Sequence, residues 1–541
     1  MPAYALVLSL LVTAPVLGPG YLLLRDAVST PRSYLTDAAL GLSEAAPRAL
    51  PQDFFIAVTS AVLDGGVVVK VLLVGGLWLA GWGAARLAAE VLSAGLPGQF
   101  IAATLAVWNP YVAERLLQGH WSLLVGYGCL PWVATAVLRL RTGARTRGAA
   151  FALVFWIAAA GLTPTGLLLA LLVALTCVAV PGDGWGRVRV AATGLAAAVL
   201  AAMPWLTAAL IGGAVNASAA ESSAGIHAFA ARAEPGLGTL GSLAGLGGIW
   251  NSAATPASRT SLFAVLATVV LLGVVVAGLP VVLRTPARRM TLPLLVLAAV
   301  AVVGPALLAT GPGLAFVESA VRTIPGLGVL RDGQKWVALA MPGYTLAAAA
   351  APVTLRRRLP ATATAALCCV ALIAVLPDLA WGVGGQMRAV RYPAGWAAAA
   401  AQINADPRPV AVLPPDVMRQ FSWSGPAPVL DPLPRWLRAD VFSTGDLSIA
   451  GHVVPGEGVR ARAIQDMLVS GATPQQLADA GVGWVVRETD GDVVVQRIGG
   501  SAPVATHRGL LIVAHLVWLG LLVGAGVGLV AQTVREARRR R

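Results

Sequence analysis

The stretch LFAVLATVVLLGVVVAGLPVVLRTPARRMTLPLLVLAAVAVVGPALLA, residues 262–309, holds two apolar runs on either side of a short arginine-rich segment. Each run approaches the roughly 20 residues that an α-helix needs to cross a bilayer. The segment between them contains Arg284, Arg288 and Arg289, and such clusters are typical of short cytoplasmic loops. The stretch therefore predicts two antiparallel membrane helices joined on the cytoplasmic side.

The rest of the chain repeats this pattern. The 541 residues are 57% hydrophobic and 12% charged, with a mean hydropathy of +0.76, whereas a soluble globular chain carries roughly 25% charged residues. Apolar runs recur from Tyr4–Leu24 to Leu510–Val530. We therefore expect an α-helical polytopic membrane protein with about 12 transmembrane helices, surrounded by the lipid bilayer.

The arginines indicate the orientation of these helices. They cluster in short segments that fall on one side when the spans are counted, and the positive-inside rule makes that side cytoplasmic. We expect a multi-pass protein of the cytoplasmic membrane with both termini in the cytoplasm. The net charge of +14 comes largely from these loops, and there is no basic face interleaved with aromatic residues, so we expect no nucleic-acid partner. The clusters lie at 139–147, 187–189, 284–289, 356–358 and 535–541.

One polar insert, 383–507, interrupts the apolar pattern. Short strand-like segments such as Trp484–Val486 alternate there with helical stretches and turn signals, which predicts a small α/β domain. We expect a bundle of about eleven spans over 1–382 with a long first outer loop at 25–64. The extracytoplasmic domain over 383–507 follows, and then a final membrane helix with a basic cytoplasmic tail over 508–541.

Metals, cofactors and disulfides are not indicated by the sequence. All four cysteines lie inside apolar runs, and no histidine stands near them at metal-ligand spacing. No Walker loop and no glycine fingerprint after a strand is present. We therefore expect no disulfide framework, no metal site and no cofactor. The cysteines are Cys129, Cys177, Cys368 and Cys369.

The first candidate cluster follows the first apolar run and contains Arg25, Asp26 and Asp37. A carboxylate at the end of a hydrophobic helix is partly desolvated, which raises its basicity and suits it to remove a proton from a hydroxyl. The sequence therefore predicts Asp26 as a general base. The alternative is a solvated ion pair between Arg25 and Asp26.

The second cluster is WNPYVAERLLQGHW, residues 108–121. In a helix Glu114 and Gln118 share a face, and the flanking aromatic residues fit a membrane interface. We expect this segment to contact the acceptor or a lipid head group. The alternative is an interfacial loop in which Glu114 pairs with its neighbour. The candidate contacts are Asn109, Tyr111, Gln118 and His120, with Arg115 as a phosphate contact and Glu114 as a candidate catalytic carboxylate.

The third cluster is PGLGVLRDGQKW, residues 325–336. Arg331 and Lys335 have i,i+4 spacing, so they point the same way if the helix starts early. Both cations suit the phosphate of a lipid, the first as a planar fork and the second as a point charge. The alternative is that Arg331 and Lys335 lie at the outer membrane surface and extend their charged groups into water.

These clusters resemble the GT-C superfamily of integral-membrane glycosyltransferases. The stretch Leu17–Asp53 looks like the first outer loop of actinobacterial members. The motifs at 109–121, 325–336 and 475–488 are similar to those of uncharacterised actinobacterial membrane proteins related to the N-terminal part of arabinofuranosyltransferase D. The resemblance implies a GT-C-like fold and transfer of a sugar from a polyprenyl-phosphate donor to an envelope glycan or glycolipid.

By position, Asp26 matches the catalytic acidic residue of that superfamily. The sequence departs from the common paired-acid pattern, because Arg25 rather than a second acid precedes Asp26. Asp37 and Glu114 therefore stay open as alternative bases. We expect an inverting enzyme in which Arg331 and Lys335, with Arg115, bind the lipid phosphate.

Two other functions remain open. A transporter or flippase for a lipid-linked sugar predicts charges deep within the spans, and Lys70 is the clear candidate. The other alternative is a non-catalytic envelope-assembly protein with the same fold, because a fold does not by itself establish an activity.

Overall fold

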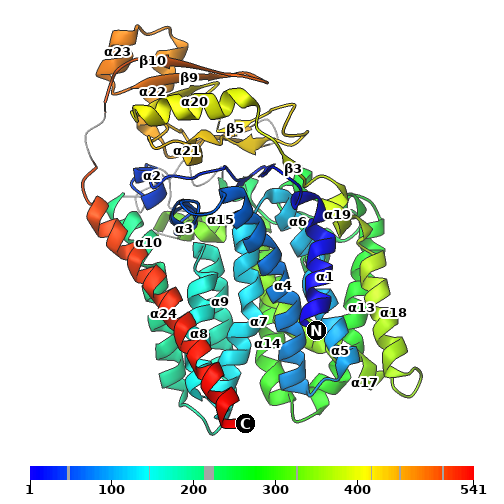
Figure 1. The fold of residues 1–541 in the computed structure, drawn as a ribbon. Coiled ribbons are helices and arrows are strands. Elements are labelled where there is room, and N and C mark those ends of the chain that lie inside the picture. Colours follow the sequence, from blue (N-terminus) through cyan, green and yellow to red (C-terminus); the bar gives the residue numbers. More distant parts are fainter. Residues whose placement is uncertain are drawn as a thin grey trace.

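The structure is a computed structural model that describes residues 1–44, 49–144, 146–212, 225–323, 327–415, 417–449, 452–501 and 505–540. Arg145, Arg541 and the start of the 325–336 motif, Pro325 and Gly326, lie outside these ranges. The long helices run side by side in one bundle, and a layer of short strands and helices covers one end of it (Figure 1). The C-terminus lies at the opposite end, and the N-terminus lies about midway along the helices.

Seven helices among the described residues are long and apolar enough to cross a membrane. The bent pair Ala361–Ala374 and Pro377–Gly384, whose halves meet at 74°, makes an eighth candidate when its two halves are counted as one span. Shorter apolar helices cover Pro2–Val16, Thr146–Ala160 and Pro164–Val178. The chain is thus a multi-pass membrane protein, but the predicted count of about 12 includes helices shorter than a full span. The seven are α4 (Gly65–Leu92), α7 (Trp121–Thr142), α10 (Arg187–Ile211), α13 (Phe263–Arg284), α14 (Arg288–Leu308), the segment Gly333–Thr354 and α24 (Arg508–Arg540).

The other helices are shorter and lie among and above the spans. Those of the bundle and its covered end are α1 (Pro2–Thr13), α2 (Asp37–Leu40), α3 (Gln52–Thr59), α5 (Leu96–Val107), α6 (Pro110–Gln118), α8 (Thr146–Ala160), α9 (Pro164–Val178), α12 (Gly238–Ala244), α15 (Gly311–Thr323), α16 (Ala340–Ala349), α17 (Ala351–Thr354), α18 (Ala361–Ala374) and α19 (Ala380–Gly384). Short 3-10 helices include η1 (Ala14–Val16), η5 (Leu327–Leu330) and η6 (Gly333–Leu339).

The expected first span, Tyr4–Leu24, is not one helix. Helix α1 ends at Thr13, and Tyr21–Leu24 forms strand β1 instead. The glycines and prolines between them break the helix, since proline lacks an N–H and glycine favours turns. The Nζ of Lys70 donates to the carbonyls of Gly18 and Gly20, at 2.7 Å each. Lys70 therefore satisfies backbone groups that the break exposes.

The layer at the end of the bundle, called the α/β layer below, runs from β3 to β10, residues 389–497. Its largest sheet has the order β10-β9-β4, with β4 parallel to β9 and β10 antiparallel to it. This agrees with the strands and helices that the sequence predicts here. The elements are β3 (Ala389–Val390), α20 (Ala394–Ala405), β4 (Val410–Leu413), β5 (Met418–Arg419), β6 (Val429–Leu430), α21 (Leu433–Trp436), β7 (Leu447–Ile449), β8 (His452–Val454), α22 (Val459–Val469), α23 (Pro474–Asp479), β9 (Trp484–Glu488) and β10 (Val493–Arg497).

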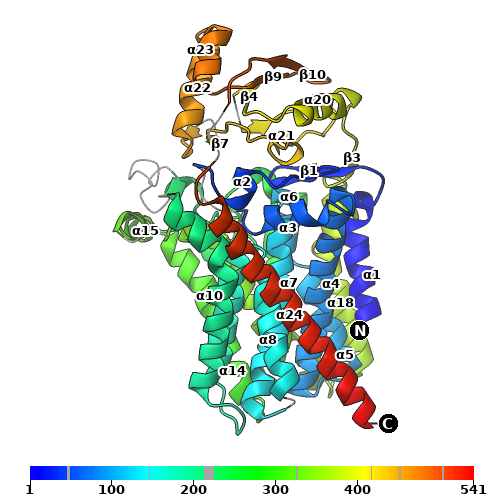
Figure 2. The same cartoon turned by 60° about the vertical axis from the view of Figure 1, so that its left-hand side comes forward.

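The chain after α1 joins the bundle to this layer. Strand β1 pairs with β2 (Ala27–Val28) on one side and with β3 on the other. Leu23 and Val28 are buried in the same cluster as Trp396 and Val410 of the layer. Figure 2 shows β1 lying between the layer and the ends of the long helices. The hydrophobic core of the layer therefore includes side chains from near the N-terminus.

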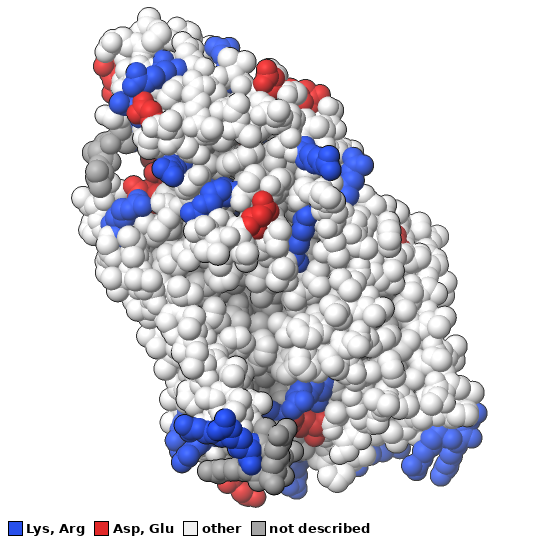
Figure 3. Space-filling model, in the orientation of Figure 1, with Lys and Arg blue, Asp and Glu red and all other residues white. Residues whose placement is uncertain are grey.

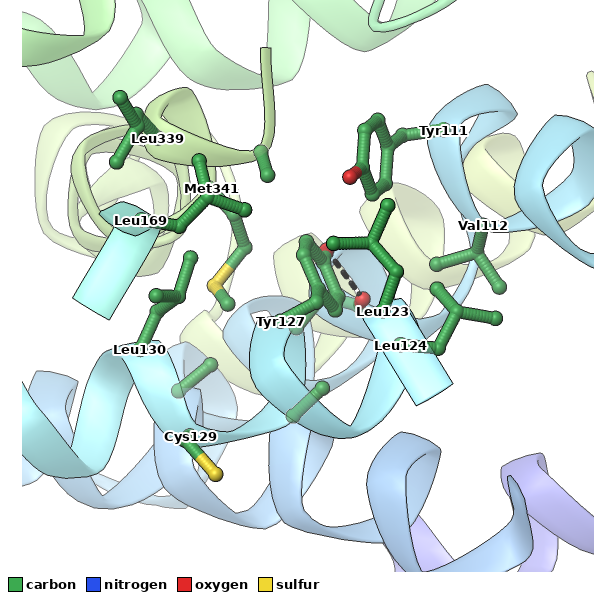
Figure 4. Packing of buried hydrophobic residues seen from close by; sticks show 14 of the residues in the cluster. Tyr111, Val112, Leu123, Leu124, Tyr127, Cys129, Leu130, Leu169, Leu339 and Met341 are labelled. Carbon is green, nitrogen blue, oxygen red and sulfur yellow. Dashed lines mark hydrogen bonds between the residues drawn. The ribbon is translucent and has the colours of Figure 1, made fainter. Parts of the chain in front are cut away.

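Helix α7 lies at the centre of the bundle and directly follows α6, around which the site described below is built. In the most apolar 18-residue stretch of α7, 89% of the residues are buried inside the protein, whereas in the corresponding stretch of α24 only 28% are. Tyr127 of α7 stacks on Tyr111 of α6, with ring centroids 5.3 Å apart, and Leu130 of α7 lies near Met341 (Figure 4). This packing fixes α6 and the start of α7 at the end that the layer covers.

On the face of the protein that Figure 3 shows, charged side chains gather toward the two ends. The face in Figure 3 shows few Lys, Arg, Asp or Glu residues between the layer and the opposite end. An uncharged band of this kind is expected where lipid tails contact the protein. At the end away from the layer, Arg139 pairs with Glu90 at 2.5 Å.

Candidate functional site

Arg25 and Asp26 form the turn of the β1–β2 hairpin, since Leu24 pairs with Ala27 across it. Arg25 has a φ of 48°, and two-residue hairpin turns favour positive φ because it matches the twist of the strands. The expectation that Asp26 ends a hydrophobic helix is therefore wrong. The short apolar run before it is a strand, and the chain turns back on itself at Asp26.

The tip of this hairpin rests on the end of α6. The backbone nitrogen of Asp26 donates to the Gln118 carbonyl at 3.2 Å. The Arg25 guanidinium donates to the carbonyls of Leu117 and Ala253, at 2.5 Å each. Arg25 is thus held by backbone carbonyls, so the alternative of a simple Arg25–Asp26 ion pair does not describe it.

Helix α6 is buried along all nine of its residues. Asn109 caps its start, accepting a hydrogen bond from the Val112 nitrogen at 3.1 Å and donating to the Leu105 carbonyl at 2.8 Å. The Tyr111 hydroxyl donates to the Lys335 carbonyl at 3.3 Å. Both side chains therefore have partners within the bundle.

Asp26 accepts two side-chain hydrogen bonds on one oxygen. Gln118 Nε2 lies 3.0 Å and His120 Nε2 2.9 Å from Oδ2. No described residue hydrogen-bonds Oδ1, and 36% of the Asp26 side chain is exposed. Burial opposes ionisation, but His120, Gln118 and the Lys335 charge together hold the pKa of Asp26 below its ordinary value. The expected rise in basicity is therefore wrong, because the hydrogen bonds outweigh desolvation.

Behind His120 lies a buried ion pair. The Arg115 guanidinium binds the Asp332 carboxylate with two hydrogen bonds, at 2.8 and 3.0 Å. Its Nη1 also lies 3.1 Å from Nδ1 of His120. Burial opposes ionisation of Asp332, but Arg115 and Lys335 hold its pKa well below the usual range. Arg115 is fully buried, so it faces Asp332 and His120 rather than the lipid phosphate for which the sequence suggested it.

Lys335 stands at the open side of this network. Its Nζ lies 3.6 Å from Oδ2 of Asp332, and a quarter of the side chain is exposed. Arg331 lies between the 3-10 helices η5 and η6, and its Nε donates to the Gly328 carbonyl at 3.2 Å. The prediction that Arg331 and Lys335 share one helical face is therefore wrong, since no helix spans both.

Glu114 of α6 is fully buried. Its carboxylate accepts from the backbone nitrogens of Gly248 and Ile249, at 3.2 and 3.1 Å, and from Gln334 Nε2 at 2.9 Å. Burial, followed by the nearby Glu234 carboxylate, raises its pKa.

Gln118 lies on the same side of α6 as Glu114. Its Oε1 accepts a hydrogen bond from Asn251 Nδ2 at 2.8 Å. Glu114 and Gln118 therefore both face the segment 248–251, as their i,i+4 spacing predicts.

Asp37 lies outside this network. It stands in the first turn of α2 and pairs with Arg508 at the start of α24. Seven of the ten predicted site residues thus belong to one set of contacts around α6, whereas Asp37, Arg331 and Asn109 have other partners. The seven are Asp26, Tyr111, Glu114, Arg115, Gln118, His120 and Lys335.

Sequence reasoning missed Asp332, Gln334 and Asn251. Asp332 had a signal, because an acid between two cations in a motif next to an apolar run is a candidate ion-pair partner. Gln334 and Asn251 had none, since their partners stand more than a hundred residues away. Among the described residues no group of three or more His, Cys, Asp or Glu side chains could hold a metal ion.

No protein-family model matches the chain, and no curated protein matches it either. Solved structures do. The structure of arabinofuranosyltransferase AftD from Mycobacteria matches 91% of this chain with a TM-score of 0.59 and 18% identity. The chain shares its fold with AftD. A mutant of AftD matches over the same share with a TM-score of 0.56 and 19% identity.

AftD is a much larger protein. The matching region covers 35% of the AftD chain in one structure and 37% in the other, so this chain spans about a third of the length of the AftD structures. The likeness confirms, at the level of the fold, the relation to arabinofuranosyltransferase D that the sequence motifs predict.

Proposed function

We propose that this chain is a membrane glycosyltransferase that moves a sugar from a polyprenyl-phosphate donor to an envelope glycan or glycolipid. The AftD-like fold supports the general class. The observation that carries the proposal is the Asp26 carboxylate, which is held on Oδ2 by Gln118 and His120 while no described residue hydrogen-bonds Oδ1. Lys335 lies close enough to lower the pKa of Asp26 by its charge. A candidate base, Asp26, and a cation, Lys335, therefore lie in the same site.

In this proposal Asp26 acts as the general base. An acceptor hydroxyl donates to Oδ1, its oxygen attacks the anomeric carbon, and its proton passes to Asp26. The low pKa keeps Asp26 ionised at physiological pH, so it takes the proton as the hydroxyl becomes acidic in the transition state. Attack opposite the phosphate inverts the anomeric configuration.

The phosphate leaves with the electron pair of the broken carbon–oxygen bond. We assign Lys335 and Arg331 to this group, since stabilising charge that develops in the transition state is a large part of catalysis. Lys335 presents a partly exposed ammonium beside the base. Arg115, Asn109 and Tyr111 serve instead to hold α6 and its neighbours, and we assign no proton transfer to Glu114 or Asp37.

We further propose that the α/β layer faces the outside of the cytoplasmic membrane and that the C-terminus faces the cytoplasm. The N-terminus, which the sequence also predicts in the cytoplasm, lies about midway along the helices and is left out of this proposal. The arginine clusters support this orientation by the positive-inside rule. The helices that end or begin in those clusters, such as α13 and α14, meet at the end away from the layer (Figure 1). A lipid-linked donor suits that side, because a nucleotide-sugar pool is absent there.

Lys70 gives no support to the transporter alternative, because its ammonium is engaged by two backbone carbonyls. The non-catalytic alternative is decided by experiment. Membranes that contain the chain are given labelled polyprenyl-phosphate sugars together with envelope glycan fragments. We expect transfer from at least one donor, with inverted configuration in the product. If the protein is folded and inserted but every labelled donor stays intact with every acceptor, the result would favour the non-catalytic assembly role.

A further inference from the structure

Arg115 sits behind His120 and in contact with it. Nη1 of Arg115 lies 3.1 Å from Nδ1 of His120, while Nε2 of the same imidazole lies 2.9 Å from Oδ2 of Asp26. Asp26, His120 and Arg115 therefore form one line of contacts, from the partly exposed carboxylate to a buried guanidinium. Asp332 closes the line by binding Arg115 with two hydrogen bonds.

The chemistry of arginine decides where the imidazole proton is. A guanidinium has only N–H donors and stays protonated. Nδ1 of His120 must therefore accept from Arg115, because an N–H there would face another N–H. The single proton of the neutral ring is then on Nε2, where it points at Asp26.

We propose that Arg115 is a positioning residue that fixes His120 as the neutral, Nε2-protonated tautomer, so that His120 donates to Asp26 and keeps the other oxygen of that carboxylate turned toward the acceptor. This inference rests on the proposed function for its catalytic consequence. The tautomer itself does not depend on that function. In this arrangement His120 transfers no proton; it orients the base.

The surroundings of His120 also favour the neutral form of its ring. Burial lowers the pKa of His120, and the charges of Lys335 and Arg115 lower it further, while the carboxylates of Asp26 and Asp332 act to raise it. The net direction is downward. The ring is thus neutral at pH values where an ordinary histidine begins to take up a second proton, and uptake of that proton would break the contact with Arg115.

Three variants of the full-length protein in membranes separate this role from others. His120→Gln keeps an amide N–H that can donate to Asp26 and an oxygen that can accept from Arg115, but it does not titrate. His120→Ala removes both contacts. Arg115→Lys keeps the charge beside Asp332 but loses the fork that reaches both Asp332 and His120.

We expect His120→Gln to keep transfer within about tenfold of the native rate, the equivalent of one ordinary hydrogen bond. His120→Ala should lose about 10²-fold or more, since small misplacement of a reacting group costs that much. The native rate should fall on the acid side below pH 6.5, and His120→Gln should remove that fall. Arg115→Lys should move the fall to higher pH, which a merely structural role would not do.

A ¹⁵N spectrum of histidine-labelled protein tests the tautomer without any transfer assay. The chain has five histidines, and the signal that His120→Gln removes belongs to His120. We expect a neutral ring protonated on Nε2 at pH 7. A ring protonated on Nδ1 or on both nitrogens would overturn the proposal, as would His120→Gln that is as inactive as His120→Ala. Failure of transfer in the native protein would count against the proposed function and leave the spectrum to decide the tautomer.

Discussion

Gly119 lies so close to the Arg25–Asp26 hairpin that a Cβ atom on it would stand 2.3 Å from the backbone nitrogen of Ala27. Its φ of +85° also belongs to the left-handed region that favours glycine. We predict that Gly119→Ala pushes the hairpin off α6, separates Asp26 from His120 and reduces transfer strongly at normal protein level.

A matched control is Gly273→Ala within α13, where a Cβ would meet nothing within 4 Å. This variant should keep full activity. The transfer rate per unit of inserted protein is the measurement. Equal activity of the two variants would show that the hairpin tolerates displacement and that its contact with α6 is not needed.

The hairpin also shows where sequence reasoning failed. Tyr21–Leu24 is four apolar residues long, and runs of that length cannot be assigned to helix or strand from their pattern. Its partner strand β3 lies more than 360 residues away, so no local signal marks the pairing. The GPG stretch before it was the available signal, because a helix does not continue through it.

Because of Glu488 in the α/β layer, we predict that the free energy of unfolding falls as the pH rises. Burial, with the neighbouring Asp431 carboxylate, raises the pKa of Glu488 to about 9. Between pH 4.5, the ordinary pKa of a glutamic acid, and pH 9, the folded protein thus keeps a proton on Glu488 that the unfolded chain releases. This contribution to stability is complete below pH 4.5 and is lost as the pH rises through 9.

The measurement is the thermal unfolding midpoint of the detergent-solubilised protein from pH 6 to pH 10. Glu488→Gln should flatten the decline, because glutamine imitates the protonated acid. Asp479→Asn, on the exposed surface of α23, should leave the decline unchanged. The Arg419 guanidinium contacts the Glu488 carboxylate, so a native profile without any decline would mean that Glu488 is ionised in the folded protein.

The α/β layer should not fold well when expressed without the N-terminal strands. Leu23 and Val28 are part of its buried cluster, so a fragment of 383–507 leaves apolar surface open to water. We predict a poorly cooperative melt for this fragment. A sharp transition above the range of about 45–65 °C that is usual for mesophilic domains would show that the layer is independent of β1 and β2.

The orientation has its own test. A reporter that is active only outside the cytoplasm should work when it is fused into the α/β layer after Gly471, an exposed position. It should fail when it is fused into the 139–147 loop, where we expect the cytoplasm. The reverse result would invert the topology and place Asp26 on the cytoplasmic side.

The candidate site was predicted in part. Glu114, Gln118 and His120 came from one compact motif, and polar residues crowded between apolar runs are uncommon enough to notice. Their partners could not be predicted, because Asn251 and Gln334 reach them only through the packing of distant segments. The sequence alone suggests Arg115 as a phosphate contact, because its buried partner Asp332 stands 217 residues away.

The most direct test of the account is the transfer rate of Asp26→Asn with saturating donor. The change removes the charge at almost constant volume and keeps an oxygen that can accept from Gln118 and His120. Since a general base contributes roughly 10²–10⁴-fold, we predict a loss of that size with donor binding and protein level retained. Asp466→Asn, exposed on α22, should behave like the native protein. Full activity of Asp26→Asn would contradict the account, because the proposed base would have lost the charge that accepts the proton.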